Sequence, residues 1–206
     1  YHLTVTTGSC STAVASKTIT VNPTPSATAT PSSQTKCSGT AITTIALTSG
    51  TGGTTFAWTR NNTGTVTGIA SSGSGNISDT LVNTTTSPIT VTFRITPTTG
   101  SCTGSNITAT VTVDPTPVAT ATPSSQSKCT NVAITTIVLT STVGGSSYSW
   151  TRDNTGSVTG IAASGSTDIS GTLVNATSAP ITVTFTITPT AGSCSGTPIT
   201  ATVIVN

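Results

Sequence analysis

The stretch that decides the fold is residues 89–113, which read ITVTFRITPTTGSCTGSNITATVTV. From Ile89 to Ile95 every second residue is apolar, and the same alternation runs from Ile107 to Val113. A period of two places the apolar side chains on one face of a β-strand and the polar ones, here mostly Thr, on the other. The stretch therefore predicts two strands, each with one face for a core and one for water.

The chain repeats itself at an offset of 92 residues. Residues 23–114 and 115–206 agree at 64 of 92 positions without a gap. Residues 1–22 continue the same pattern, so that Cys10 falls on Cys102. We therefore expect residues 1–22 to be the last strands of a truncated repeat, followed by complete repeats at 23–114 and 115–206. The chain is then an excerpt from a longer tandem array.

Each repeat carries signals for seven short strands and none for a helix. Further strands are expected at 26–31, 41–49, 54–60, 65–69 and 77–83, with Gly-rich turns between them. Seven strands with a Trp on the third predict an all-β fold of tandem immunoglobulin-like sandwiches. A solenoid, the main alternative, requires units of about 20–50 residues, and no shorter period is present.

The alternation also predicts the core. In the first repeat the inward positions are Ile45, Leu47, Phe56, Trp58, Ile77, Leu81, Val91, Phe93, Ile95, Val111 and Val113. In the second they are Ile137, Leu139, Tyr148, Trp150, Ile169, Leu173, Val183, Phe185, Ile187, Val203 and Val205.

The composition argues against most chemistry. Thr and Ser number 56 and 29 of 206 residues, whereas there are four Asp, no Glu and one His. General acid–base catalysis and metal binding have few candidate groups here, and His2 is expected to face solvent at the position of Arg94. A net charge of +2 without a basic cluster argues against nucleic acid. We expect no enzyme activity, no cofactor and no membrane insertion of this segment.

An ordered set of motifs resembles a known family. Its members are Pro-Thr-Pro at 23–25, Cys37-Ser38-Gly39, Phe56-Ala57-Trp58-Thr59, GIASSGSGNI at 68–77, PITVT at 88–92, GSCTG at 100–104 and ITATVTV at 107–113. On these motifs the chain resembles the PKD-like repeats of Bacteroidota surface proteins, which stack in long type IX-secreted adhesins of the gliding-motility kind. The resemblance implies the bacterial cell surface, a spacer or adhesive role, and no catalytic residues.

The five cysteines predict disulfides in an extracellular protein. Metal ligands would lie closer together in sequence. We favour pairing within repeats, because disulfides in such families usually form within a single domain. The bonds would then be Cys37–Cys102 and Cys129–Cys194, and Cys10 would lack its partner. The corners that carry Cys37 and Cys102 nevertheless lie at opposite poles of an ordinary immunoglobulin fold. The alternative is a bond between neighbouring repeats, Cys37–Cys194.

Two further features allow a functional and a structural interpretation. Asp79-Thr80-Leu81 resembles the O-glycosylation motif of Bacteroidota, and Gly171 replaces Asp79 in the second repeat. Arg60 follows Trp58 by two positions, and the pair could bind a sugar; an Arg whose stem covers a core Trp is the simpler interpretation.

These observations favour a structural, non-catalytic segment of a long extracellular fibre or adhesin stalk. The alternative is a glycan- or surface-binding module repeated along an adhesin; an ice-binding Thr array is disfavoured because sandwich sheets twist. Neighbouring repeats of the same chain are the expected partners, with identical chains packed laterally and surface polysaccharide as further candidates.

Overall fold

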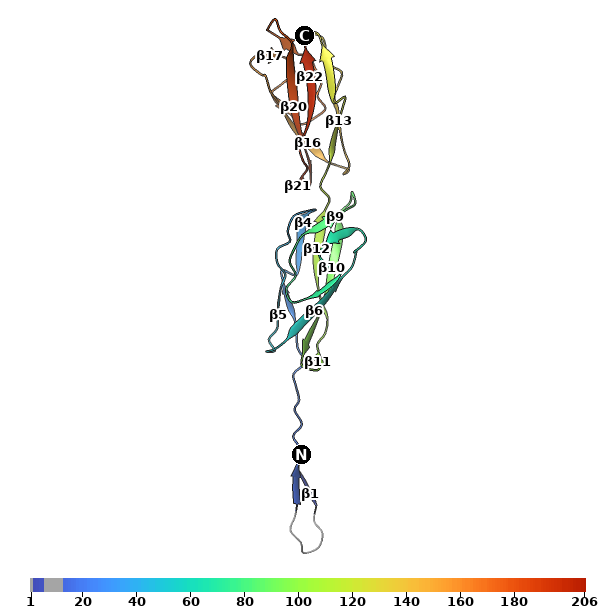
Figure 1. Cartoon of the computed structure of the whole chain (residues 1–206), viewed down its shortest axis with the longest axis vertical. Helices are drawn as coiled ribbons and strands as arrows, with labels where there is room; N and C mark the ends of the chain where they lie inside the picture. The colour runs from blue at the N-terminus through green and yellow to red at the C-terminus, as the bar shows by residue number, and fades with distance from the viewer. Residues whose placement is uncertain (1, 6–12) are drawn as a thin grey trace.

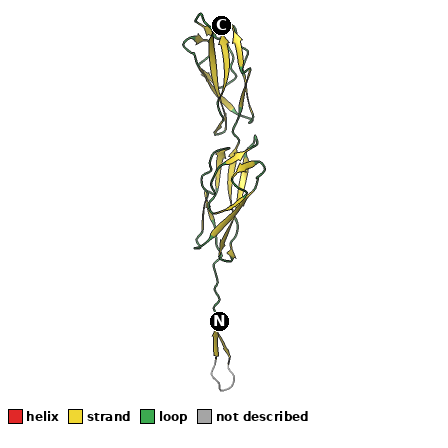
Figure 2. Ribbon diagram, in the orientation of Figure 1, coloured by secondary structure: helices red, strands yellow, loops and turns green. Residues whose placement is uncertain are grey.

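The computed structural model of the chain describes residues 2–5 and 13–206, which form β-strands and connecting loops. Two β-sandwiches follow each other end to end along the long axis, and the C terminus lies at the far end of the second (Figure 1). Figure 2 shows the same arrangement by secondary structure, with strands throughout and no helix drawn in the described residues. That part of the chain accordingly contains no helix long and apolar enough to cross a membrane.

One layer of the first sandwich is a sheet in the order β4-β12-β10-β6-β8, with the short β11 (Cys102–Thr103) paired to β10. Its strands are β4 (Ser33–Cys37), β6 (Thr55–Arg60), β8 (Ser72–Ser74), β10 (Ile89–Thr99) and β12 (Ile107–Asp114). The alternating stretch 89–113 supplies β10 and β12, which pair antiparallel with Phe93 opposite Ala109.

The second layer consists of two strand pairs joined by single bridges. Its strands are β3 (Thr28–Thr30), β5 (Ala46–Thr48), β7 (Val66–Gly68) and β9 (Leu81–Asn83). β3 pairs with β5 and β7 with β9, and the bridges Ile45–Ile77 and Ala41–Thr80 connect the pairs. Two layers with one apolar face each enclose a core, as the alternation predicts.

The second sandwich repeats this topology. Its large sheet has the order β14-β22-β20-β16-β18, with β21 paired to β20. The strands are β13 (Ala119–Thr122), β14 (Ser125–Lys128), β15 (Val138–Ser141), β16 (Ser147–Arg152), β17 (Val158–Thr159), β18 (Ser164–Gly165), β19 (Val174–Asn175), β20 (Ile181–Ala191), β21 (Cys194–Ser195) and β22 (Ile199–Val205). The prediction of an all-β fold of tandem sandwiches is confirmed.

The predicted core residues lie in the core of their sandwich, with one exception in each repeat. Phe56 and Tyr148 are only partly buried and pack against the core from its rim. The Trp rings lie edge-on to the central Phe residues, with centroids 5.7 Å apart in both Trp58–Phe93 and Trp150–Phe185. The prediction missed further core positions: Ala29, Ile42, Val66, Ile69 and Ala109, and their counterparts Ala121, Ile134, Val158, Ile161 and Ala201.

The strand prediction was incomplete at β4. This strand runs parallel to β12, with Gln34 opposite Val111, and it ends at Cys37. Its sequence, SQTKC, has no apolar alternation because an edge strand of this kind contributes little to the core. In contrast, only Ala46–Thr48 of the predicted strand 41–49 is regular. β4 matters for function because it delivers Cys37 to one end of the sandwich.

Ahead of the first sandwich, β1 (His2–Val5) pairs with β2 (Ala13–Ser16). His2 lies opposite Ser16, which is the Arg94–Thr108 pairing of β10 and β12 shifted by 92 residues. The assignment of residues 1–22 to a truncated repeat and the divisions at 22 and 114 remain predictions. Cys10 lies outside the described residues.

Candidate functional site

The candidate site is the junction between the two sandwiches. We call the end of a sandwich at which β12 or β22 ends its upper pole, and the opposite end its lower pole. At the upper pole of the first sandwich, Cys37 ends β4 opposite Asp114. At the lower pole of the second, the turn between β20 and β21 places Cys194 opposite Ala191.

A disulfide joins these two poles. The Sγ atoms of Cys37 and Cys194 are 1.99 Å apart and their Cα atoms 5.5 Å apart, within the range that a disulfide requires. The favoured pairing within repeats, Cys37–Cys102 and Cys129–Cys194, is therefore replaced by the alternative between repeats. The reason is the course of β4, which carries Cys37 to the upper pole while β11 keeps Cys102 at the lower one.

The other two described cysteines have no disulfide partner in the described part of the chain. Cys102 is half-buried at the lower pole of the first sandwich, and Cys129 is exposed at the upper pole of the second. They are the counterparts of Cys194 and Cys37, respectively, at an offset of 92 residues. Of the four cysteines predicted to form disulfides, Cys37 and Cys194 are bonded, and Cys102 and Cys129 are free among the described residues.

The linker Pro115-Thr116-Pro117 is packed into the junction rather than exposed. Both prolines are buried, and the Thr116 hydroxyl donates to the Ser38 carbonyl at 3.2 Å. An added Cβ at Gly196 would lie 2.0 Å from the Pro117 carbonyl oxygen. Glycine at 196 is therefore needed for the lower pole to close on the linker.

Buried asparagines hold the upper poles, and the sequence analysis did not identify them. The Asn83 side chain donates to the carbonyls of Ser87 and Val113 at 2.8 Å each. Its amide oxygen accepts from the Thr85 N–H at 2.9 Å and from the Thr85 hydroxyl at 2.8 Å. Asn175 repeats this arrangement in the second sandwich. A sequence signal exists, since the asparagine closes an LVN motif before the Ser/Thr-rich turn in both repeats.

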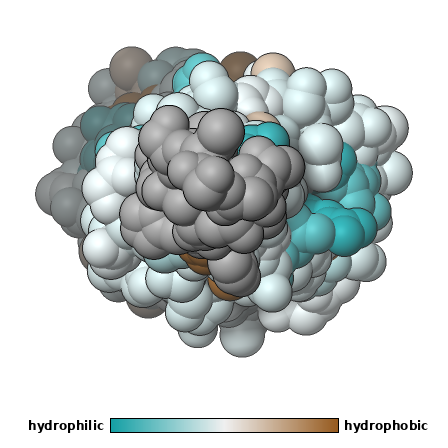
Figure 3. Space-filling view, turned by 90° about the horizontal axis from the view of Figure 1, so that it is seen from below, coloured by the Kyte–Doolittle hydropathy of each residue, from teal (hydrophilic) through white to brown (hydrophobic). Residues whose placement is uncertain are grey.

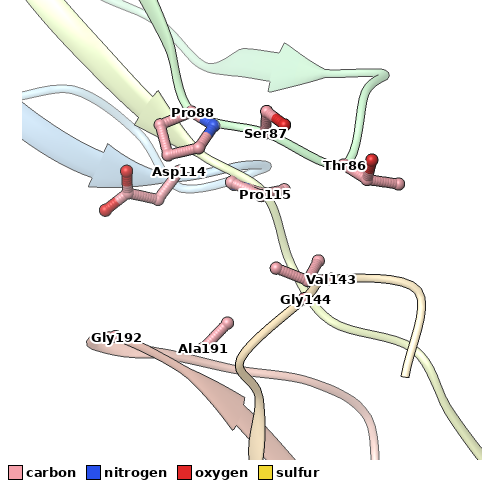
Figure 4. A pocket seen from close by; sticks show the side chains of 9 residues that line it. All are labelled: Thr86, Ser87, Pro88, Asp114, Pro115, Val143, Gly144, Ala191 and Gly192. Atoms are coloured by element: carbon pink, nitrogen blue, oxygen red, sulfur yellow. The ribbon is translucent and has the colours of Figure 1, made fainter. Parts of the chain in front are cut away.

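Beside the linker lies a hollow of about 380 Å³ between the two sandwiches (Figure 4). Its lining comprises Thr86, Ser87, Pro88, Asp114 and Pro115 at the upper pole of the first sandwich and Val143, Gly144, Ala191 and Gly192 at the lower pole of the second. Asp114 is its one charged group. Within residues 2–5 and 13–206, no group of three His, Cys, Asp or Glu side chains is placed to hold a metal ion.

The arginines after the core tryptophans bind backbone carbonyls. Arg152 is buried, and its guanidinium donates to Ile161 at 2.9 Å and to Val158 at 3.0 Å. Arg60 makes the equivalent bonds to Ile69 at 2.8 Å and Val66 at 3.0 Å. Desolvation lowers the pKa of both guanidiniums from the ordinary value of arginine, yet arginine stays charged at neutral pH. The arginines thus hold the first residue of β7 or β17 and the loop that follows the strand.

The tryptophans lie beside shallow hollows that differ between the sandwiches. That of Trp58 includes Arg94 and Thr96, whereas that of Trp150 includes Asp168 and Ser170. The Trp150 Nε1–H donates to the Thr167 carbonyl at 2.8 Å. The Trp58 Nε1–H is buried without an acceptor among the described residues. These two hollows therefore do not share one arrangement of polar groups around the tryptophan.

Thr80, the candidate O-glycosylation site, is half-buried at the bridge to Ala41. Asp79 before it is exposed, with a φ of 123°, and its carboxylate accepts from the Thr80 N–H at 2.8 Å. Glycosylation of Thr80 remains a prediction.

Two end-to-end sandwiches with related sequences define a tandem β-sandwich repeat protein of the immunoglobulin-like class. The family model described as PKD-like domain matches residues 34–117 and 122–206. The chain belongs to this family, in two tandem copies. A search of curated proteins found no similar sequence.

Among solved structures, the chain is similar to the crystal structure of DIP-gamma IG1+IG2, with a TM-score of 0.47 and 10% identity over 90% of this chain and 98% of that one. It is also similar to human protocadherin-24 EC1-2, with a TM-score of 0.44 and 16% identity over 90% and 99%. Sidekick-1 immunoglobulin domains 1–4 give 0.40 and 14% over 87% and 48%.

Proposed function

We propose that this chain is a non-catalytic structural segment of a long extracellular fibre or adhesin stalk on a bacterial cell surface. The observation that carries the proposal is the Cys37–Cys194 disulfide across the junction. A covalent bond between the poles of successive sandwiches restrains bending and separation, which a spacer needs and an independent binding domain does not. Disulfides persist in oxidising, extracellular compartments.

The surface supports a hydrated spacer. Seen from the N-terminal end, the surface around the grey residues is mostly pale, hence neither strongly hydrophilic nor hydrophobic (Figure 3). This agrees with outer sheet faces made largely of Thr and Ser, whose hydroxyls remain hydrated while the β-branched Thr favours the strand. The resemblance to stacked repeats of type IX-secreted adhesins supports the same role.

The alternative function is a glycan-binding module in every repeat. It would require an equivalent site in both sandwiches, whereas the hollows beside Trp58 and Trp150 have different linings. A glycan array probed with the whole chain distinguishes the two. We expect no selective binding. Glycan binding that is weakened by Arg94→Ala, which leaves the core tryptophan in place, as well as by Trp58→Ala would favour the module.

Lateral packing of identical chains is part of the proposal. The second sandwich exposes Val118, Val132, Val138 and Ile204, between 42% and 59% accessible, where the first has Ser26, Thr40, Ala46 and Thr112. Edge strands with open hydrogen-bonding groups also favour association. Analytical ultracentrifugation at increasing concentration should detect dimers or larger species; a strict monomer would contradict lateral packing and leave the spacer role intact.

The proposal as a whole is tested on cells and in solution. Antibodies raised against the chain should label intact, unpermeabilised cells of the source bacterium. Spin labels on the outer faces of the two sandwiches should give one narrow distance distribution in the oxidised protein. Labelling only after permeabilisation, or a broad distribution in the oxidised chain, would overturn the structural role.

A further inference from the structure

Cys102 and Cys129, which have no disulfide partner among the described residues, lie in the same backbone setting as the bonded pair. Thr130 N–H donates to the Asn206 carbonyl at 2.8 Å beside Cys129, as Ser38 N–H donates to the Asp114 carbonyl at 2.8 Å beside Cys37. At the other pole, Cys102 lies opposite Thr99 in the register that places Cys194 opposite Ala191. Each unpaired cysteine therefore has the backbone setting of one that is bonded in this same chain.

We propose that the repeats form a disulfide ladder, in which Cys129 bonds the second cysteine of a following repeat and Cys102 bonds the first cysteine of a preceding one. The inference rests on the proposed function, since a ladder requires an array. Each bond joins two thiols and releases two electrons and two protons. A disulfide-bearing oxidant, such as glutathione disulfide or an oxidoreductase, accepts them and becomes a pair of thiols.

The ladder has a consequence that a single bond does not. Every junction is crossed twice, once by the linker backbone and once by a disulfide. At the present junction the backbone crossing belongs to the segment from Cys102 to Cys129, and the disulfide is Cys37–Cys194. With both ends bonded, the segment 102–129 and its counterparts form two covalent tracks that are offset by one repeat.

These tracks are short and consist largely of strands. Between Cys102 and Cys129 the chain follows β12 along the first sandwich, the linker, and then β13 and β14 along the second, with bends at Pro123 and Ser124 (Figure 1). Its 27 residues can reach at most about 90–97 Å. Two repeats without disulfides, 184 residues, could be drawn out to about 600–660 Å.

With its disulfides formed, the array can therefore be stretched to only about one-sixth of the length that an unlinked chain of the same repeats would reach. Force applied along the fibre passes through the tracks, and the sandwich segments enclosed by the disulfides do not unravel. The kind of partner that fits each open pole is another repeat of this family, bearing a cysteine at the counterpart of Cys37 or Cys194.

The first test lengthens the whole chain by a second copy of residues 115–206, with one outer-face Thr-to-Ser change to mark its peptides by mass. After oxidation with glutathione disulfide, peptide mapping should find Cys37–Cys194 and a new bond from Cys129 to the second cysteine of the added copy. The reactivity of Cys129 toward iodoacetamide should fall at least ten-fold relative to the 206-residue chain. A Cys129→Ser version is the control for peptide assignment.

Cys129 that stays reactive, or that bonds Cys194, would overturn the ladder. The added copy has the sequence of a sandwich that already folds in this chain, and tryptophan fluorescence checks its folding. Failure of this test leaves the cell-labelling test untouched, and failure of cell labelling leaves the bond pattern untouched, so the two proposals fail separately.

The second test measures extension directly. Pulled from its termini in an optical trap, the oxidised 206-residue chain should lack the length of the loop between Cys37 and Cys194, whose separation of 157 residues corresponds to about 520–570 Å. Cys37→Ser should release that length. Equal contour lengths for the two would overturn the limit on extension.

Discussion

The lower poles of the two sandwiches share a sequence but not an environment. Cys194 is 1% exposed inside the junction, whereas its counterpart Cys102 is half-buried. Pro115 of the linker is buried, whereas Pro23 is exposed. The backbone at the two turns is nevertheless paired in the same register. The turn therefore has the same backbone pairing whether or not a second sandwich packs against it, and the packed neighbour adds burial and a covalent bond.

The poles also show where the repeats have diverged. At the lower pole, Val143 is 8% exposed in the junction and stands where the first repeat has Thr51. Val118 N–H donates to the Thr142 hydroxyl at 3.1 Å, a bond that Gly50 does not provide in the first repeat. The strand β13 accordingly includes four residues and β3 three. The first strand is therefore longer in the second sandwich, whose lower pole packs against a neighbour, than in the first.

The largest expected effect comes from removing the covalent part of the junction. Cys37→Ser opens a loop of 157 residues in sequence separation, and the chain-entropy estimate for such a loop is about 5 kcal/mol. We expect the melting temperature in scanning calorimetry to fall by roughly ten degrees or more.

Cys129→Ser is the matched control, because Cys129 has no disulfide partner within the described residues. Its melting temperature should stay within a degree or two of that of the parent chain. If both variants melted together, the Cys37–Cys194 bond would contribute nothing to stability.

The sequence predicted the layers and most of the core because the alternation of Ile, Val and Phe with Thr is strict in β10 and β12. It predicted disulfides but favoured pairing within repeats and left Cys37–Cys194 as the alternative, because the choice between them depends on the course of β4. The residues of β4 carry no apolar pattern, and their position is set by hydrogen bonds to β12, with Gln34 opposite Val111. The junction was equally hidden, because Pro-Thr-Pro indicates a linker whether it is exposed, as at Pro23, or buried, as at Pro115.

A smaller loss of stability is expected when a methyl group is added to the glycine that contacts the linker at each lower pole. An added Cβ at Gly196 meets the Pro117 carbonyl oxygen at 2.0 Å, and one at Gly104 meets that of Pro25 at 1.8 Å. Gly196→Ala should cost roughly 2–3 kcal/mol and Gly104→Ala about 1 kcal/mol less, because the linker before Pro25 is exposed and can move. Urea unfolding of both variants measures the difference. A costlier Gly104→Ala would mean that the junction does not hold its linker.

The tryptophan environments predict a still smaller difference. Trp150→Phe leaves the Thr167 carbonyl without its donor, whereas Trp58→Phe removes an N–H that has no acceptor in the described part of the chain. The loss of ring volume is common to both, so the hydrogen bond should make Trp150→Phe costlier by about 1 kcal/mol. Chemical denaturation followed by circular dichroism provides the measurement, and equal costs would contradict the assigned bond.

The smallest effect is expected on the outer faces, where the two sandwiches should behave alike. Thr92 and Thr184 occupy equivalent positions of β10 and β20 and are both half-buried. Their backbone N–H groups donate to the side-chain oxygens of Asn61 and Asp153 at 2.7 Å each. A change of the Thr side chain to Ala leaves these backbone hydrogen bonds in place. Thr92→Ala and Thr184→Ala should each lower the free energy of unfolding by about 0.5 kcal/mol or less, mainly through strand preference. A loss above about 1 kcal/mol at Thr184 alone would show that the junction reaches this face, and a loss of that size at both would mean that the outer Thr rows pack against something.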